Sequence, residues 1–219
     1  MVSTVHDPAS SILTPTPSLF PNDIVFLQRL LRQAGHYQGA IDGKFGAGSD
    51  KALQAFMLEY QAIRDQLGSF DSRSEATIRT LLPPAQRAAR QFLGKGNQAL
   101  GGGLTVRLLS GSRTYQEQND LYAKGRTKPG SIVTKAKGGQ SNHNFGIAFD
   151  AGIFDGSVYL DGNTQAELKR YVDLAKAARG KLEWGGDWKS FKDLPHYQLA
   201  LGLSIKELRS RFESGAKIV

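Results

Sequence analysis

The chain contains no cysteine. Disulfide bridges, cysteine-ligated metal sites and thiol nucleophiles are therefore excluded, and any metal ion must be held by histidine, aspartate or glutamate. Histidine is also scarce, because the 219 residues include four. No apolar run approaches the roughly 20 residues that a membrane span requires. The first twenty residues lack a basic start followed by an apolar segment, so no secretion signal is expected.

The composition is that of an ordinary globular protein, with 40% hydrophobic and 22% charged residues. The charge is unevenly distributed along the chain. Residues 1–83 carry seven basic and eight acidic side chains, whereas residues 84–219 carry 21 and 12, a net charge of +9. Such a field attracts nucleic acid, anionic polymers or acidic substrates over about 8 Å in physiological salt.

The composition and the positions of the prolines divide the chain into three parts. Residues 1–21 are rich in serine, threonine and proline and predict a flexible leader. Residues 22–83 predict a small all-α domain, and the adjacent prolines Pro83 and Pro84 mark its end. Residues 84–219 then form a larger second domain.

The small domain is expected to contain three short helices and a glycine-rich turn. Apolar residues at helical spacing predict the first two helices, over residues 24–34 and 49–61. A capping box formed by Ser72 and Glu75 predicts the start of the third. The Asp-Gly pair within residues 41–46 favours a tight turn between the first two helices.

The larger domain mixes helices and short strands without a regular alternation, which predicts an α+β fold. Residues 121–149 have five basic side chains, no acidic one and several glycines, and are expected to be mostly loop. The expected helices are residues 86–100, 115–123, 164–178 and a final one that starts with the capping box of Ser204 and Glu207, and the expected strands are residues 104–109 and 181–184.

Two of the four histidines, His143 and His196, lie in this second domain. Asp150 follows His143 by seven residues, and Asp193 precedes His196 by three. A catalytic zinc site keeps three nitrogen or oxygen ligands and one open position for water, so His143, Asp150 and His196 could supply the ligands. Asp193 could then act as the general base. From spacing alone, an ordinary packed or surface role is the more common one for such side chains, because short motifs often occur by chance.

The segment Ser141-x-His143-x-x-Gly146-x-Ala148-x-Asp150, followed by Asp193-x-Pro195-His196, resembles the signature of a known enzyme family. The family is that of the zinc peptidoglycan peptidases of the D-alanyl-D-alanine carboxypeptidase and L-alanyl-D-glutamate endopeptidase type. Two further stretches agree with it, namely Ser110-Gly111-Ser112-Arg113-Thr114-Tyr115-x-x-Gln118-x-x-Leu121-Tyr122 and Glu183-Trp184-Gly185-Gly186-Asp187-Trp188. Together these motifs span most of residues 84–219 in the family's order.

The resemblance implies a small antiparallel sheet with flanking helices and zinc in a cleft. It implies a role for each matching residue: zinc ligands at His143, Asp150 and His196, a general base at Asp193, an oxyanion-facing group at Arg113 and a substrate contact at Ser141. A permanently charged guanidinium suits the oxyanion role. Ser141 could equally shape the turn before His143. The two tryptophans are more typical of packing or of a pocket wall. Glu183 could form hydrogen bonds that support a ligand residue, and it is not placed among the catalytic residues.

The small domain carries a second resemblance. Gly35-x-Tyr37, Ile41-Asp42-Gly43-x-Phe45-Gly46 and Ala55-Phe56 are similar to the three-helix peptidoglycan-binding domain of wall hydrolases, although Gly48-Ser49-Asp50 replaces the threonine that usually follows the turn. The alternative is that Asp42, Gly43 and Gly46 only build a turn.

The two resemblances together imply a zinc metallopeptidase that hydrolyses the stem peptide of bacterial peptidoglycan. The favoured activity is that of an L-alanyl-D-glutamate endopeptidase that lyses cell walls as an endolysin. The alternatives are a D-alanyl-D-alanine (D,D- or L,D-) carboxypeptidase in wall remodelling and a non-catalytic wall-binding protein. Nucleic-acid binding rests on charge alone, because no motif that reads nucleic acid is present.

The expected cofactor is Zn²⁺ and the expected partner is peptidoglycan. We expect a monomer that neither binds nucleic acid nor inserts stably into a membrane. Without a secretion signal, the protein would be made in the cytoplasm of its host bacterium. It would reach the wall through a holin-type lesion or another non-standard route.

Overall fold

The structure, a computed structural model, describes residues 21–219, with side chains from Ile24 onward. The leader expected over residues 1–21 lies outside the described residues, except for Pro21, which begins helix α2. The chain divides into two compact units. Unit 1 comprises residues up to Leu58, Ser112–Gly146 and Leu203–Val219, and unit 2 comprises Glu59–Gly111 and Ile147–Gly202.

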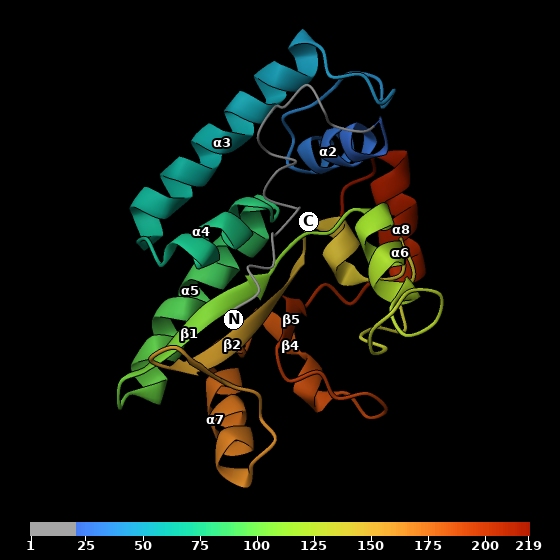
Figure 1. Ribbon diagram of the computed structural model, residues 1–219. Coiled ribbons are helices and arrows are strands. Elements are labelled where there is room, and N and C mark those ends of the chain that lie inside the picture. Colours follow the sequence, from blue (N-terminus) through green and yellow to red (C-terminus); the bar gives the residue numbers. More distant parts are fainter. Residues whose placement is uncertain (1–20) are drawn as a thin grey trace. The chain divides into compact units, whose positions relative to one another are not determined.

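Figure 1 labels the α-helices and most of the strands of the described residues. The α-helices are α2 (Pro21–Gln33), α3 (Ala47–Leu67), α4 (Ser72–Arg79), α5 (Pro83–Leu100), α6 (Tyr115–Ala123), α7 (Gln165–Ala175) and α8 (Ile205–Ser214). The strands are β1 (Leu104–Ser110), β2 (Ala148–Asp155), β3 (Val158–Leu160), β4 (Leu182–Trp184) and β5 (His196–Leu199). Three short 3₁₀ helices are η1 (Asn142–Phe145), η2 (Lys176–Ala178) and η3 (Gly185–Asp187).

The caps of two helices test the sequence motifs directly. The capping box expected for the last helix is confirmed, because the Ser204 side chain and Glu207 bond each other's backbone at the start of α8. The box expected at the start of α4 is wrong. Asp71 is the N-cap there and accepts a hydrogen bond from the Ser74 amide, while Glu75 is engaged elsewhere.

Unit 2 contains an antiparallel sheet in the order β1-β2-β5-β4, with β3 paired to β2. Helix α5 packs against β1 and β5, and α4 packs against β1. Figure 1 shows the long arrows of β1 and β2 side by side, with α5 along them. The expected α+β class with a small antiparallel sheet and flanking helices is therefore confirmed.

One face of this sheet is aromatic. Phe149 of β2 and Tyr197 of β5 stack with ring centroids 5.9 Å apart. Phe92 of α5 lies on both rings, at centroid distances of 5.6 Å and 4.4 Å. Since successive residues of a strand point to opposite faces, the neighbours Asp150 and His196 belong to the other face.

Unit 1 has a core of its own. Phe212 of α8 contacts Phe26 of α2 and Phe145 of η1, with centroids 5.8 Å and 5.5 Å apart. The buried Gln33 amide ties the end of α2 to the C-terminal segment. It donates to the Ala216 carbonyl at 2.8 Å and accepts from the Ile218 amide at 3.0 Å.

The Ile-Asp-Gly motif of the small domain forms a turn around the fully buried Gln28. The Gln28 carbonyl oxygen accepts from the amides of Asp42 and Gly43 at 3.1 Å and 3.0 Å, and its amide group donates to the Asp42 carboxylate at 2.9 Å. The hydrogen bond from Gln28 lowers the pKa of Asp42. Gly43 has φ 70°, a conformation that glycine adopts without strain. These residues thus have a demonstrable role in building the turn.

A buried ion pair joins α4 to α5 within unit 2. The Arg90 guanidinium, which has no exposed side-chain surface, donates to both oxygens of Glu75 at 2.7 Å and 2.8 Å. Tyr60 donates to the same carboxylate at 2.5 Å, and so does the Phe70 amide at 2.8 Å. Burial acts to raise the pKa of Glu75, but these hydrogen bonds, led by that from Arg90, bring it below its ordinary value.

Among residues 21–219, no helix combines the length and the apolar character needed to cross a membrane.

We expect Glu75→Gln to lower the free energy of unfolding by about 3 kcal/mol, because it leaves a charged guanidinium buried without its counter-ion. The Glu75 carboxylate stabilises the fold above its unfolded pKa, near 4.5, and this contribution is lost as the pH falls through the lower folded pKa. Urea unfolding of wild type and variant should therefore give curves that converge below pH 4.5.

Asp65→Asn is the matched control, since Asp65 pairs with Arg64 on the surface and should contribute less than about 1 kcal/mol. If the difference in free energy of unfolding between Glu75→Gln and wild type did not change with pH, the stabilising role of the ionised Glu75 carboxylate would be contradicted.

Candidate metal centre

The antiparallel register aligns a row of polar residues across three strands. Asp150 of β2 lies opposite Ser110 of β1 and opposite His196 of β5. Directly opposed residues on neighbouring strands project from the same face of a sheet. The row therefore lies on the face away from the aromatic core.

Both oxygens of Asp150 have partners in this row. Oδ1 lies 3.4 Å from Nδ1 of His196, and Oδ2 accepts a hydrogen bond from the Ser110 hydroxyl at 2.5 Å. Ser110 thereby fixes the rotation of the carboxylate, and Oδ1 is the oxygen turned toward the imidazole. The register of Ser110 opposite Asp150 follows a β-bulge, because the pairing shifts between Leu108 and Ser110.

His143 lies on the short helix η1, and its side chain is 2% exposed. The helix ends at Gly146, whose φ of 72° lets the chain turn sharply toward β2. The next residue after His143, Asn144, is fully buried and organises the loop within unit 1. Its oxygen accepts from the Gly139 amide at 2.9 Å, and its amide group donates to the Arg113 carbonyl at 2.9 Å.

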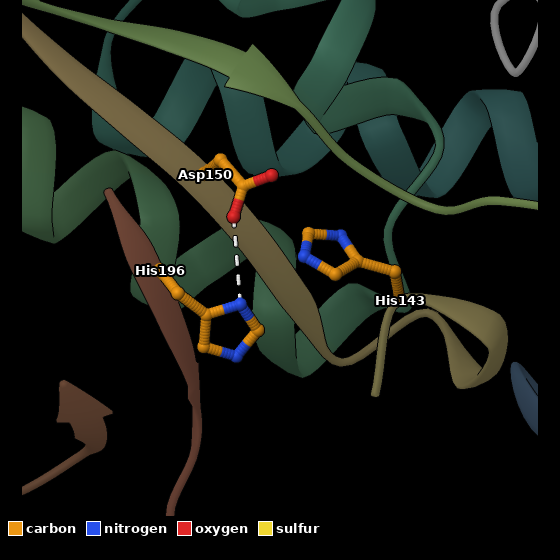
Figure 2. A group of neighbouring side chains, drawn as sticks. All are labelled: His143, Asp150 and His196. Atoms are coloured by element: carbon orange, nitrogen blue, oxygen red, sulfur yellow. Dashed lines mark ion pairs between the residues drawn. The ribbon is translucent and has the colours of Figure 1, made fainter. Parts of the chain in front are cut away.

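Figure 2 shows the side chains of His143, Asp150 and His196 pointing toward one another. Among the described residues they form a group in which one ligand atom of each lies within 4.8 Å of the others. Both imidazoles are buried and the carboxylate is half-buried. The structure thus brings together the three residues that the sequence nominates as ligands.

The donor set suits a zinc ion. Zinc binds imidazole nitrogen and carboxylate oxygen at about 2 Å in tetrahedral geometry, so two of its ligand atoms lie about 3.3 Å apart. The 3.4 Å between Asp150 Oδ1 and His196 Nδ1 agrees with that separation. Nitrogen and oxygen ligands without sulfur are also those that zinc shares with other first-row divalent metals.

The surroundings of His196 combine burial with negative charge. Burial acts to lower the pKa of His196, but the hydrogen bond and charge of Asp150 outweigh it, so the net pKa is raised. The charge of Asp193 adds to the rise. The Trp188 ring covers the imidazole at a centroid distance of 4.9 Å, which supports the expectation that this tryptophan forms a wall.

The expected base, Asp193, lies in the turn that leads into β5. Its amide donates to the Gly185 carbonyl at 3.1 Å, and its own carbonyl accepts from the His196 amide at 3.2 Å. A side chain at Gly185 would meet the turn, because its Cβ would lie 2.5 Å from the Asp193 carbonyl oxygen and 3.0 Å from His196 Cβ. Gly185 therefore permits the close approach that places both residues.

Arg113 follows β1, and its backbone is joined to the His143 segment. Its amide donates to the His143 carbonyl at 3.0 Å. Its guanidinium donates to the Gln118 carbonyl oxygen at 3.0 Å, while the Gln118 amide group donates to the Ala136 carbonyl at 2.9 Å. Gln118 is fully buried, so its hydrogen bond restricts the position of the Arg113 guanidinium within unit 1.

Ser141 stands immediately before η1 and is half-buried. Its amide donates to the Asn144 side-chain oxygen at 3.3 Å, and its carbonyl accepts from the Asn144 amide at 2.9 Å. These backbone bonds show that Ser141 contributes to the turn. Its expected contact with substrate stays a prediction.

Sequence reasoning misses the residues that hold the site residues in place. The sequence predicts no role for Asn144, which follows His143. Ser110 and Gln118 match positions of a family motif but are given no role either. The residue type could have indicated these positioning roles, because a buried amide or hydroxyl needs hydrogen-bond partners and therefore tends to join segments.

Comparison with known proteins bears on the same residues. Residues 134–199 match the family model described as D-alanyl-D-alanine carboxypeptidase, and residues 21–57 match that of a peptidoglycan binding domain. The peptidoglycan L-alanyl-D-glutamate endopeptidase CwlK of Bacillus subtilis (strain 168) is 43% identical over 105 residues, which cover 44% of this chain and 62% of the relative. These matches confirm the resemblance to peptidoglycan peptidases.

The chain thus spans less than two thirds of the length of this relative. A solved structure, that of the Serratia marcescens L-Ala D-Glu endopeptidase ChiX, is 28% identical and has a TM-score of 0.45. The comparison covers 61% of this chain and 90% of that one.

We expect Gly185→Ala to destabilise the protein by about 1–3 kcal/mol, because the added methyl group would collide with the turn that carries Asp193. Gly94→Ala is the control. Gly94 lies within α5 with no atom close to its would-be Cβ, so alanine there should stabilise the helix by about 0.5–1 kcal/mol. Urea unfolding measures both, and equal stability of Gly185→Ala and wild type would refute the packing argument.

Proposed function

We propose that this protein is a zinc-dependent peptidase that hydrolyses the stem peptide of bacterial peptidoglycan, with His143, Asp150 and His196 as the zinc ligands. The observation that carries the proposal is the convergence of these three side chains, with ligand atoms within 4.8 Å of one another. The matches to the carboxypeptidase family model and to CwlK support the same reaction class.

The bound zinc ion would polarise the scissile carbonyl and increase the acidity of water. Asp193 accepts a proton at a carboxylate oxygen when water attacks the carbonyl carbon. It then delivers this proton to the nitrogen of the leaving amine as the C–N bond breaks. Arg113 donates hydrogen bonds to the oxyanion that develops on the carbonyl oxygen, and Ser141 contacts the substrate backbone.

The bond that we propose is the one between L-alanine and D-glutamate, which is the bond that the name of CwlK specifies for that relative. The family description favours a second candidate, a carboxypeptidase that removes terminal D-alanine. Both reactions use the same water attack and differ in which part of the stem peptide enters the site.

The match to a peptidoglycan binding domain over residues 21–57 supports docking of the protein on the wall. We infer that it acts as a monomeric, endolysin-like lytic enzyme that reaches the wall after synthesis in the host cytoplasm. The net charge of +9 on residues 84–219 favours encounter with the carboxylates of stem peptides.

We expect Asp193→Asn to lower kcat for wall digestion by about 10²- to 10⁴-fold, because the amide cannot accept the proton of water. The zinc content should stay that of wild type, since Asp193 is not among the proposed ligands. Asp173→Asn, which removes a carboxylate from the exposed face of α7, should leave kcat unchanged. Equal turbidity loss with wild type and Asp193→Asn would favour a non-catalytic wall-binding protein.

The products of wall digestion distinguish the two peptidases. Mass spectrometry of purified peptidoglycan after digestion should show new free amino groups on D-glutamate, because the endopeptidase frees that nitrogen. Release of free D-alanine without new D-glutamate amines would establish the carboxypeptidase instead. Wild type treated with a chelator and then dialysed is the blank, and added zinc should restore the products.

A further inference from the structure

A chain of two hydrogen bonds leads away from His196 on the side opposite Asp150. Nε2 of His196 lies 3.0 Å from the Gln198 side-chain oxygen. The Gln198 amide group in turn donates to a carboxylate oxygen of Glu183 at 2.8 Å. Gln198 and Glu183 lie directly opposite each other on β5 and β4, so the strand pairing itself holds the two side chains together.

The chemistry of these groups sets the direction of each bond. A carboxylate only accepts hydrogen bonds, so Glu183 accepts one from the NH₂ group of Gln198. The amide oxygen of Gln198 then faces His196. An amide oxygen also only accepts, so Gln198 offers an acceptor at 3.0 Å for a proton on Nε2 of His196. The Asp150 carboxylate, which is also an acceptor, lies farther away, 3.4 Å from Nδ1. The shorter contact favours the proton on Nε2, which leaves the lone pair of the neutral imidazole on Nδ1.

We propose that Gln198 and Glu183 are positioning residues that hold His196 in the Nε2-protonated tautomer and present the Nδ1 lone pair to a metal ion. This inference rests on the metal centre of the proposed function. Ligating histidines commonly donate their other ring N–H to an acceptor, and loss of that acceptor typically weakens metal binding by about 10- to 100-fold.

The two flanks of the centre are thereby held in different ways. Ser110 orients the carboxylate of Asp150 from β1, and the Gln198–Glu183 pair orients the imidazole of His196 from β4 and β5. Gln198 is half-buried and Glu183 is exposed, so bulk water competes for their hydrogen bonds. The fixed register of β4 and β5 offsets this competition, because it already holds Gln198 and Glu183 side by side. Less conformational entropy is therefore lost when their side chains form the hydrogen bond.

The test compares three variants of the full chain with wild type. Gln198→Leu keeps the approximate size but removes the acceptor for Nε2–H. The double variant Glu183→Gln with Gln198→Glu exchanges the two side chains, which restores an acceptor next to His196 and a donor next to that acceptor. Gln91→Leu is the matched control, since it removes a glutamine that accepts from Lys181 away from the centre.

Two measurements report on the proposal without using activity. Zinc affinity is measured by competition with a chromophoric chelator. The tautomer of His196 is measured by ¹⁵N NMR of the metal-free protein at a pH where the imidazole is neutral, and the His196 signals are identified by their loss in His196→Asn. Thermal unfolding of every variant checks that it is folded.

We expect Gln198→Leu to bind zinc about 10- to 100-fold more weakly than wild type and to show a mixture of the two tautomers. The exchanged double variant should recover most of the affinity and the Nε2–H signal, whereas Gln91→Leu should match wild type in both. Recovery by the exchange is the outcome that a purely structural role of Gln198 does not produce.

Wild-type affinity and an unchanged tautomer in Gln198→Leu would overturn the inference while leaving the proposed function intact. A double variant that folds and yet binds zinc as weakly as Gln198→Leu would also overturn it. Failure of wild type to bind zinc would instead reject the metal centre itself, so the two failures are distinguishable.

Discussion

The antiparallel pairing of β2 with β5 is the constraint on which the rest of the site depends. It sets Asp150 opposite His196 on one face of the sheet and Phe149 opposite Tyr197 on the other. The aromatic pair is buried against Phe92, so hydrophobic burial fixes the register that the polar pair requires. A slip of one residue would put a carboxylate and an imidazole into the core, at a cost of several kcal/mol. Packing on one side therefore determines chemistry on the other.

Primary amides carry out much of the remaining positioning. Asn144 connects the His143 segment to Arg113, Gln118 anchors the Arg113 guanidinium, and Gln28 builds the turn of the small domain. Each is fully buried, and each uses both its donor and its acceptor. An amide can join two backbone segments without introducing charge, which makes it suited to loops that must be both rigid and buried.

The sequence predicts well what depends on local pattern. Helix α6 has the expected bounds, β1 is one residue longer than expected, and the ligand candidates do converge. Prediction fails where burial removes the pattern of alternating polar and apolar residues. The central strand β2 is buried on both faces, so it lacks the alternation that identifies a strand. Its first residues therefore fall within the expected loop. The start of α4 is mispredicted because Glu75 serves Arg90, a partner 15 residues away that local capping rules do not consider. The domain boundary expected at Pro83 and the roles of Asp193, Arg113 and Ser141 stay predictions.

The bonds of Gln33 to Ala216 and Ile218 have a consequence for evolution and for engineering. Helix α2, which lies in the segment that matches the peptidoglycan binding domain, ends in a buried glutamine that hydrogen-bonds residues 216 and 218. Grafting residues 21–57 onto another enzyme would leave the Gln33 amide without these two partners. A transplant would have to carry α8 and its tail along, so recombination at this junction is expected to be rare.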